Sequence, residues 1–102
     1  ITLYQHNAHA NCNFSYFPIL VEADYPLSRD ELYDKLKAHG ILSRRYFYPL
    51  ISNMPMYRGL PTADTAHLPQ ANALAEKVLC LPIFNELTIE QQQQVIALIK
   101  GN

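Results

Sequence analysis

Residues 43–52 read SRRYFYPLIS and place two arginines, Arg44 and Arg45, beside three aromatic residues, Tyr46, Phe47 and Tyr48. A guanidinium binds a carboxylate or a phosphate through parallel hydrogen bonds, and an aromatic ring packs against a flat or sugar-like ligand. The run therefore indicates the wall of a site for a ligand with both features. An ordinary strand whose arginines extend into water explains the same run, and the pattern alone favours that explanation.

If residues 43–48 form a strand, their side chains alternate between its two faces. Ser43, Arg45 and Phe47 then share one face, and the even-numbered residues from 44 to 48 share the other. One set is expected to join the core under the helices. The other set, an arginine and two tyrosines, would lie on a face that a two-layer domain leaves uncovered.

The rest of the chain offers few residues for other chemistry. His6, His9 and Cys12 are spaced like metal ligands, but no fourth ligand lies near them, so we predict no metal site. No pair of nucleophile and base is visible, because Ser28 and Thr88 are explained as helix caps. We therefore predict no catalytic residue in this chain.

Length and charge limit the class of protein. The 102 residues fit one small domain, residues 1–102, and a net charge of −1 argues against a general nucleic-acid partner. No apolar run is long enough to span a bilayer, and the start does not resemble a signal peptide, so we predict a cytoplasmic protein without a membrane partner. The chain starts at Ile1 within a strand-like segment, and we expect it to be a fragment of a longer protein.

The hydrophobic pattern predicts an α+β domain in two layers, with a small, mostly antiparallel sheet and helices on one face. A long irregular connection over residues 48–67 is typical of functional loops. Strands are expected near residues 1–5, 14–23, 41–47 and 79–84, and helices near 28–40, 68–78 and 88–101.

Two helices carry clear start signals. Ser28 with Glu31, and Thr88 with Gln91, have the spacing of a capping box. Gly40 and Gly101 are suited to end the same two helices. The residues expected to face inward are Leu32, Tyr33, Leu36, Ile89, Ile96 and Ile99.

Three ordered motifs resemble one known family. They are GILSRRYFYPLISNMPMYRGLPTA at 40–63, LPQANALAEKVLCLPIF at 68–84 and LTIEQQQQVIALIKG at 87–101. Together they are similar to the C-terminal small domain of the DegT/DnrJ/StrS-type nucleotide-sugar aminotransferases, which are pyridoxal-phosphate enzymes of fold type I. The resemblance covers essentially the whole chain.

The resemblance implies a partner domain and a reaction. A large N-terminal domain, absent from this chain, would supply the Schiff-base lysine and hold the pyridoxal phosphate, so the fragment itself is expected to be inactive and to bind no cofactor. Glutamate would donate the amino group, and the full-length enzyme would be a homodimer. Ser52 stands where other branches often carry histidine, which implies a dTDP-linked 4-keto-6-deoxy sugar, with dTDP-4-keto-6-deoxyglucose as the nearest candidate.

The resemblance also implies which residues line the substrate. Phe47 and Tyr48 would face the sugar, and Arg44 or Arg45 would meet an anionic group, while the loop through Ser52, Asn53 and Tyr57 would form the rim. The substrate-binding residues predicted in this way are Arg44, Arg45, Tyr46, Phe47, Tyr48, Ser52 and Tyr57, with Tyr16 and Asn13 as weaker candidates.

A second hypothesis needs no missing domain. An independent α+β module that recognises a nucleotide or a small acid would also place arginines beside aromatic rings. Such a module would have a preformed pocket around residues 44–48 and would bind its ligand alone.

Overall fold

The computed structural model describes residues 1–3, 15–46, 48–84 and 86–101. Its sheet has four antiparallel strands in the order β1-β2-β4-β3. The predicted α+β class with an antiparallel sheet is therefore confirmed. The strands are β1 (Thr2–Leu3), β2 (Phe17–Leu20), β3 (Arg44–Arg45) and β4 (Val78–Leu81).

Three α-helices form at the predicted places: α1 (Arg29–Ala38), α2 (Pro69–Lys77) and α3 (Ile89–Lys100). Both capping boxes are present. The hydroxyls of Ser28 and Thr88 accept from the backbone N–H of Glu31 and Gln91, whose side chains accept in turn from the backbone N–H of Ser28 and Thr88. Gly101 adopts the left-handed conformation, with φ of 89°, that lets glycine end a helix. Local signals therefore fix where α1 and α3 begin and end.

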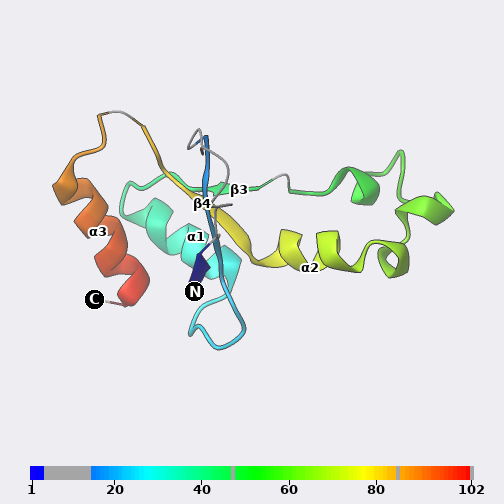
Figure 1. Ribbon diagram of the computed structural model, residues 1–102, viewed down its shortest axis with the longest axis horizontal. Coiled ribbons are helices and arrows are strands. Elements are labelled where there is room, and N and C mark those ends of the chain that lie inside the picture. The colour runs from blue at the N-terminus through cyan, green and yellow to red at the C-terminus, as the bar shows by residue number, and fades with distance from the viewer. Residues whose placement is uncertain (4–14, 47, 85, 102) are drawn as a thin grey trace, which may run out of the picture.

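The core lies between one face of the sheet and helices α1 and α3. Ile19 of β2 and Leu79 of β4 pair across the ladder, and both are fully buried. Leu32 and Leu36 of α1 and Leu98 of α3 complete the cluster. Figure 1 shows α1 and α3 side by side, while α2 lies apart from them.

The end of α3 is tied to the rest of the core by polar contacts. A helix leaves its last carbonyls without intrahelical partners, and here two side chains supply them. Lys35 Nζ of α1 donates to the Leu98 carbonyl at 2.8 Å, and the Tyr25 hydroxyl donates to the Ile99 carbonyl. Burial of Tyr25 raises the pKa of its phenol.

The predicted inner face of α3 is wrong for two residues. Ile89 and Ile96 are 68% and 50% exposed, whereas Val95 and Leu98 are buried. Successive helical residues are rotated by about 100°, so a face centred on Val95 and Leu98 turns Ile96 away from the core. Ile99 packs only partly against the core.

Two predicted strands are shorter than the pattern suggested. The ladder of β2 covers four residues of the expected 14–23, and β3 covers two of the expected 41–47. Aromatic and β-branched residues continue beyond both ends, but strand propensity depends on a pairing partner, and β4 pairs only opposite these residues.

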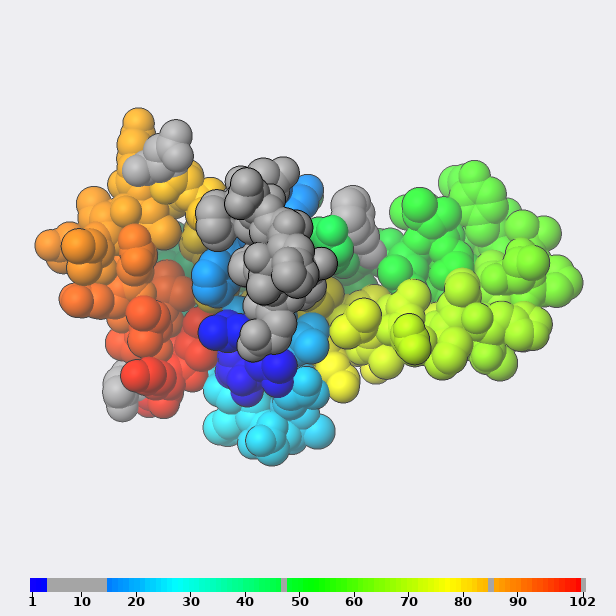
Figure 2. Space-filling model, in the orientation of Figure 1, coloured from blue at the N-terminus to red at the C-terminus, as the bar shows by residue number. Residues whose placement is uncertain are grey.

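Residues 49–77, called the arm here, extend sideways from the sheet as a loop and helix α2 (Figures 1 and 2). Three short 3-10 turns, Ile51–Asn53, Pro61–Ala63 and Thr65–His67, shape the loop. Only Ala63 and Ala75 of the arm are buried. Five of its large apolar side chains are exposed, namely Ile51, Met56, Tyr57, Leu60 and Leu74.

The core packing predicts a clear contrast between two leucines. Leu36→Ala removes a side chain that is 0% exposed and should lower the free energy of unfolding by about 2–5 kcal/mol. Leu42→Ala, at a residue that is 74% exposed, is the control and should change stability by less than about 0.5 kcal/mol. Urea unfolding followed by circular dichroism measures both, and equal losses would contradict this packing.

Candidate functional site

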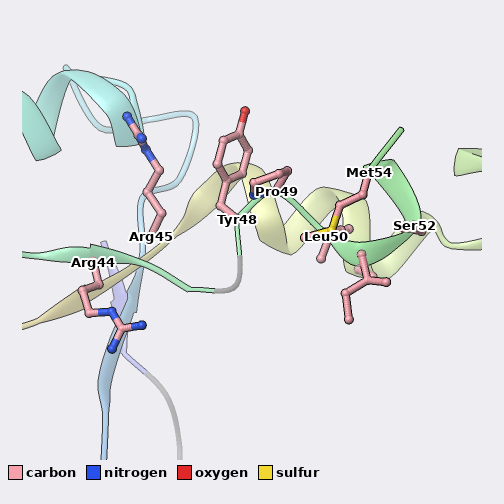
Figure 3. A pocket seen from close by; sticks show the side chains of 9 residues that line it. Arg44, Arg45, Tyr48, Pro49, Leu50, Ser52 and Met54 are labelled. Atoms are coloured by element: carbon pink, nitrogen blue, oxygen red, sulfur yellow. The ribbon is translucent and has the colours of Figure 1, made fainter. Parts of the chain in front are cut away.

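The two arginines of β3 point to opposite faces of the sheet (Figure 3). Arg45 lies opposite Leu79 of β4 and shares its face with the helices, whereas Arg44 lies opposite Cys80. This alternation follows from the pleat of a strand. The two guanidiniums therefore meet different surroundings, although they are neighbours in sequence.

Arg45 is held by groups of this chain. Its Nε donates to Asp30 Oδ1 at 2.9 Å. Its guanidinium lies over the Tyr33 ring at 4.6 Å and over the Tyr48 ring at 5.6 Å from the centroids. Such cation–π contacts favour a fixed guanidinium orientation, so Arg45 is mainly a structural cation.

Arg29, which the sequence gave no reason to select, is the buried cation of the site. It is 5% exposed, and its Nε donates to Asp30 Oδ1 at 2.8 Å. Its Nη1 donates to the carbonyls of Ala75 at 2.6 Å and Val78 at 3.3 Å. Its guanidinium lies 4.8 Å from the centroid of the Tyr48 ring.

Asp30 therefore accepts hydrogen bonds from two arginines at one oxygen. Burial alone would raise the pKa of its carboxyl, but the hydrogen bonds and positive charges of Arg29 and Arg45 outweigh that effect and lower it. The carboxylate is consequently ionised and holds the two guanidiniums next to each other. Without it, two like charges would face each other near Tyr48.

Beside these groups lies an open hollow of about 540 Å³ at the base of the arm (Figure 3). Four of the predicted substrate-binding residues line it: Arg44, Arg45, Tyr48 and Ser52. The remaining lining residues were not selected from the sequence, because they are the apolar part of an irregular loop and one residue of α2. They are Pro49, Leu50, Ile51, Met54 and Ala71.

Among the described residues, the other predicted site residues, Tyr46, Tyr57, Tyr16 and Asn53, do not line this hollow. The Tyr46 ring packs edge-on against Tyr16, with centroids 5.2 Å apart. Tyr57 lies further along the arm and is 42% exposed. Phe47 and Asn13 lie outside the described residues. Asn53 donates from its side chain to the Asn72 side chain, which ties the loop to α2.

The predicted grouping of Tyr48 with Arg44 and Tyr46 is wrong. The ladder of β3 ends at Arg45, so the alternation of a strand does not continue to Tyr48. The chain turns, and the Tyr48 ring comes to lie against the guanidiniums of Arg29 and Arg45. Tyr48 thus stands at the point where the chain leaves the sheet and enters the arm.

Arg44 is the cation that remains available to a ligand. It is exposed, and within the described residues no carboxylate or carbonyl bonds to its guanidinium. Buried Cys80 lies opposite it on β4; burial raises the pKa of that thiol, although the charge of Arg44 acts against the rise. Arg44, Tyr48 and a set of apolar residues thus all line the hollow, although the Arg44 guanidinium points away from the Tyr48 ring (Figure 3).

The described residues do not fit the site of an amine-bound cofactor. Such a site needs a lysine that is buried or otherwise activated. Lys35 Nζ is bound to the Leu98 carbonyl, Lys77 Nζ pairs with Glu22 at 3.2 Å, and Lys37 and Lys100 are exposed. The chain therefore offers no lysine for a Schiff base.

His6, His9 and Cys12 lie outside the described residues, and the described part contains no cluster of three metal-ligating side chains. Within that part, none of the helices combines the length and apolar character needed to cross a membrane.

The whole arrangement corresponds to a known family. The profile of the DegT/DnrJ/EryC1/StrS aminotransferase family matches residues 1–100. The chain belongs to this family. It is 24% identical, with a TM-score of 0.78 over 98% of its length, to a DegT/DnrJ/EryC1/StrS aminotransferase from Brucella abortus, which supports the same fold.

Two relatives with the same name match most of the chain. Over 99% of its length the chain is 52% identical to the dTDP-4-amino-4,6-dideoxy-D-glucose transaminase of Escherichia coli. Over 86% of its length it is 47% identical to the Shigella dysenteriae protein of the same name. The chain spans about a quarter of these relatives, 27% and 23% of their lengths.

The shared carboxylate predicts a pH dependence. Because the pKa of Asp30 is lowered in the folded chain, its contribution to stability is present above the unfolded value, about 4, and is lost as the pH falls through the folded value. The free energy of unfolding should therefore fall more steeply between pH 5 and 3 in the unmodified chain than in Asp30→Asn. Asp34→Asn, on the exposed side of the same helix, should keep the steep fall. Identical slopes for all three proteins would contradict the ion pairs.

Proposed function

We propose that this chain is the small C-terminal domain of a pyridoxal-phosphate-dependent nucleotide-sugar aminotransferase, and that its hollow forms one wall of the substrate cleft. The observation that carries the proposal is a hollow lined by Arg44, Tyr48 and Ser52, in a chain 52% identical to a protein named as a transaminase. An independent binding module is not favoured, because the matched relatives are about four times longer than this chain.

The proposed substrate is dTDP-4-keto-6-deoxyglucose, with glutamate as amino donor. Arg44 would bind an anionic group, either the diphosphate of the nucleotide sugar or the carboxylate of glutamate. Tyr48 would pack against the sugar ring, and Ser52 would hydrogen-bond a hydroxyl at the rim. Phe47 and Tyr57 remain predicted contacts of the same ligand.

The remainder of the enzyme would supply what this chain lacks. A large domain would provide the lysine and hold pyridoxal phosphate, since no described lysine here is suited to it. The exposed apolar side chains of the arm support a covering surface, because a lone small domain seldom leaves so many together. A cytoplasmic homodimer without nucleic-acid or membrane partners completes the proposal.

In this arrangement the domain contributes orientation rather than bond chemistry. A wall that fixes the anionic end of a substrate holds the reacting carbon near its partner, and an apolar lining excludes water. The chain alone is therefore expected to have no transaminase activity.

The test uses the full-length enzyme, with glutamate and dTDP-4-keto-6-deoxyglucose as substrates and chromatography of the amino sugar as readout. Arg44→Ala should lower kcat/KM by roughly 10- to 100-fold, mainly through KM, because a hydrogen bond to a charged group is lost. Lys37→Ala, at an exposed lysine of α1, is the control and should behave like the unmodified enzyme.

Two results would contradict the proposal. One is a full-length protein that transfers no amino group to a nucleotide 4-keto sugar. The other is activity, or a stoichiometric imine band with pyridoxal phosphate, from the 102-residue chain alone.

A further inference from the structure

Arg29 joins three segments that are far apart in the sequence. It is the first residue of α1, and its guanidinium contacts carbonyls that lie 46 and 49 residues away. It also lies against the ring of Tyr48. The two carbonyls belong to the end of α2 and the start of β4, and Tyr48 directly precedes the arm.

Both ends of the arm are therefore fastened to one side chain. The contacts at Ala75 and Val78 hold the exit of the arm, and the contact with Tyr48 holds its entry. The exit of the arm is also held by Lys77, whose carbonyl accepts from the Val21 N–H at 2.9 Å and whose Nζ pairs with Glu22 at 3.2 Å. Among these contacts, Arg29 is the side chain that touches both the entry and the exit of the arm.

A buried charge is retained only when its partners compensate for lost water. Arg29 has such partners in the Asp30 carboxylate and two backbone carbonyls, all within 3.3 Å. These bonds fix the plane of the guanidinium, and the Tyr48 ring rests against it at 4.8 Å. Arg45, bound to the same carboxylate, approaches the same ring at 5.6 Å.

We propose that Arg29 is a positioning residue for the substrate: it acts through Tyr48, whose ring lines the hollow, and it fixes the arm that forms the hollow's outer wall. The proposal rests on the proposed function for the identity of the ligand. In this proposal Arg29 controls the shape of the hollow from outside it. Arg29 itself lines no part of the hollow.

The experiment is a double-mutant cycle in the full-length enzyme, with Arg29→Met, Tyr48→Leu and the double variant. Arg29→Met should raise the KM for dTDP-4-keto-6-deoxyglucose roughly tenfold and change kcat much less, because the ring loses its cation–π partner. If Arg29 acts through Tyr48, the double variant should have about the KM of Tyr48→Leu alone. Lys37→Met is the control for a change on the exposed side of α1.

An unchanged KM in Arg29→Met would overturn the proposal. So would a double variant whose KM rises by the product of the two single-variant increases, because the two residues would then act independently. If Arg29→Met does not fold, Arg29→Lys is measured instead, since lysine keeps the charge but has no planar guanidinium to bond the Asp30 carboxylate and both carbonyls while lying against the ring. That variant should raise KM similarly, and a KM equal to that of the unmodified enzyme would also overturn the proposal.

Failure of the proposed function would look different. The unmodified enzyme would then not use the nucleotide sugar. In that case amide hydrogen exchange of the unmodified enzyme and of Arg29→Met tests whether Arg29 positions the arm. Arg29→Met should speed exchange over residues 48–77 and leave α3 unchanged. Equal exchange over the arm in both proteins would overturn the positioning role independently of any substrate.

Discussion

One carboxylate oxygen, Asp30 Oδ1, accepts hydrogen bonds from Arg29 at 2.8 Å and from Arg45 at 2.9 Å. The two arginines come from a helix and a strand, and each presents a guanidinium to the ring of Tyr48. The carboxylate thereby links α1 to β3. Nη1 of Arg29 donates to the Ala75 carbonyl and links α1 to the end of α2. Arg45 and Tyr48 belong both to this ion cluster and to the lining of the hollow, so the cluster lies directly beside it.

The domain divides into a well-packed part and an open part. Ile19, Leu32, Leu36 and Leu79 are almost completely buried between the sheet and two helices. The arm buries little and exposes five large apolar side chains. Exposing apolar side chains to water is unfavourable in free energy. Such a surface is typical of a domain that packs against another protein surface. Arg44 lines the hollow at the base of this arm.

Local signals in the sequence predict the helices well, because a capping box or a terminal glycine acts within a few residues. Local signals predict less about which side chains are buried and which residues pair, because contacts between distant parts of the chain determine both. The inner face of α3 depends on how the helix meets the sheet, and so Ile96 was misplaced. Arg29 sits beside a helix cap in the sequence, and its partners at Ala75 and Val78 lie too far along the chain for any pattern to reveal. Three residues of the arginine–aromatic run, Arg44, Arg45 and Tyr48, line the hollow, but the early end of β3 places Tyr48 at the ion cluster and not on the open face.

The central claim is that the hollow is one wall of a cleft that another part of the enzyme completes. Amide hydrogen exchange, with and without a saturating dTDP-sugar, tests it most directly when the full-length enzyme is compared with the 102-residue chain. The account predicts that the nucleotide sugar slows exchange over residues 48–54 in the full-length enzyme and leaves the 102-residue chain unchanged. Equal protection of that segment in the short chain, or no protection of it in the full-length enzyme, would contradict the account.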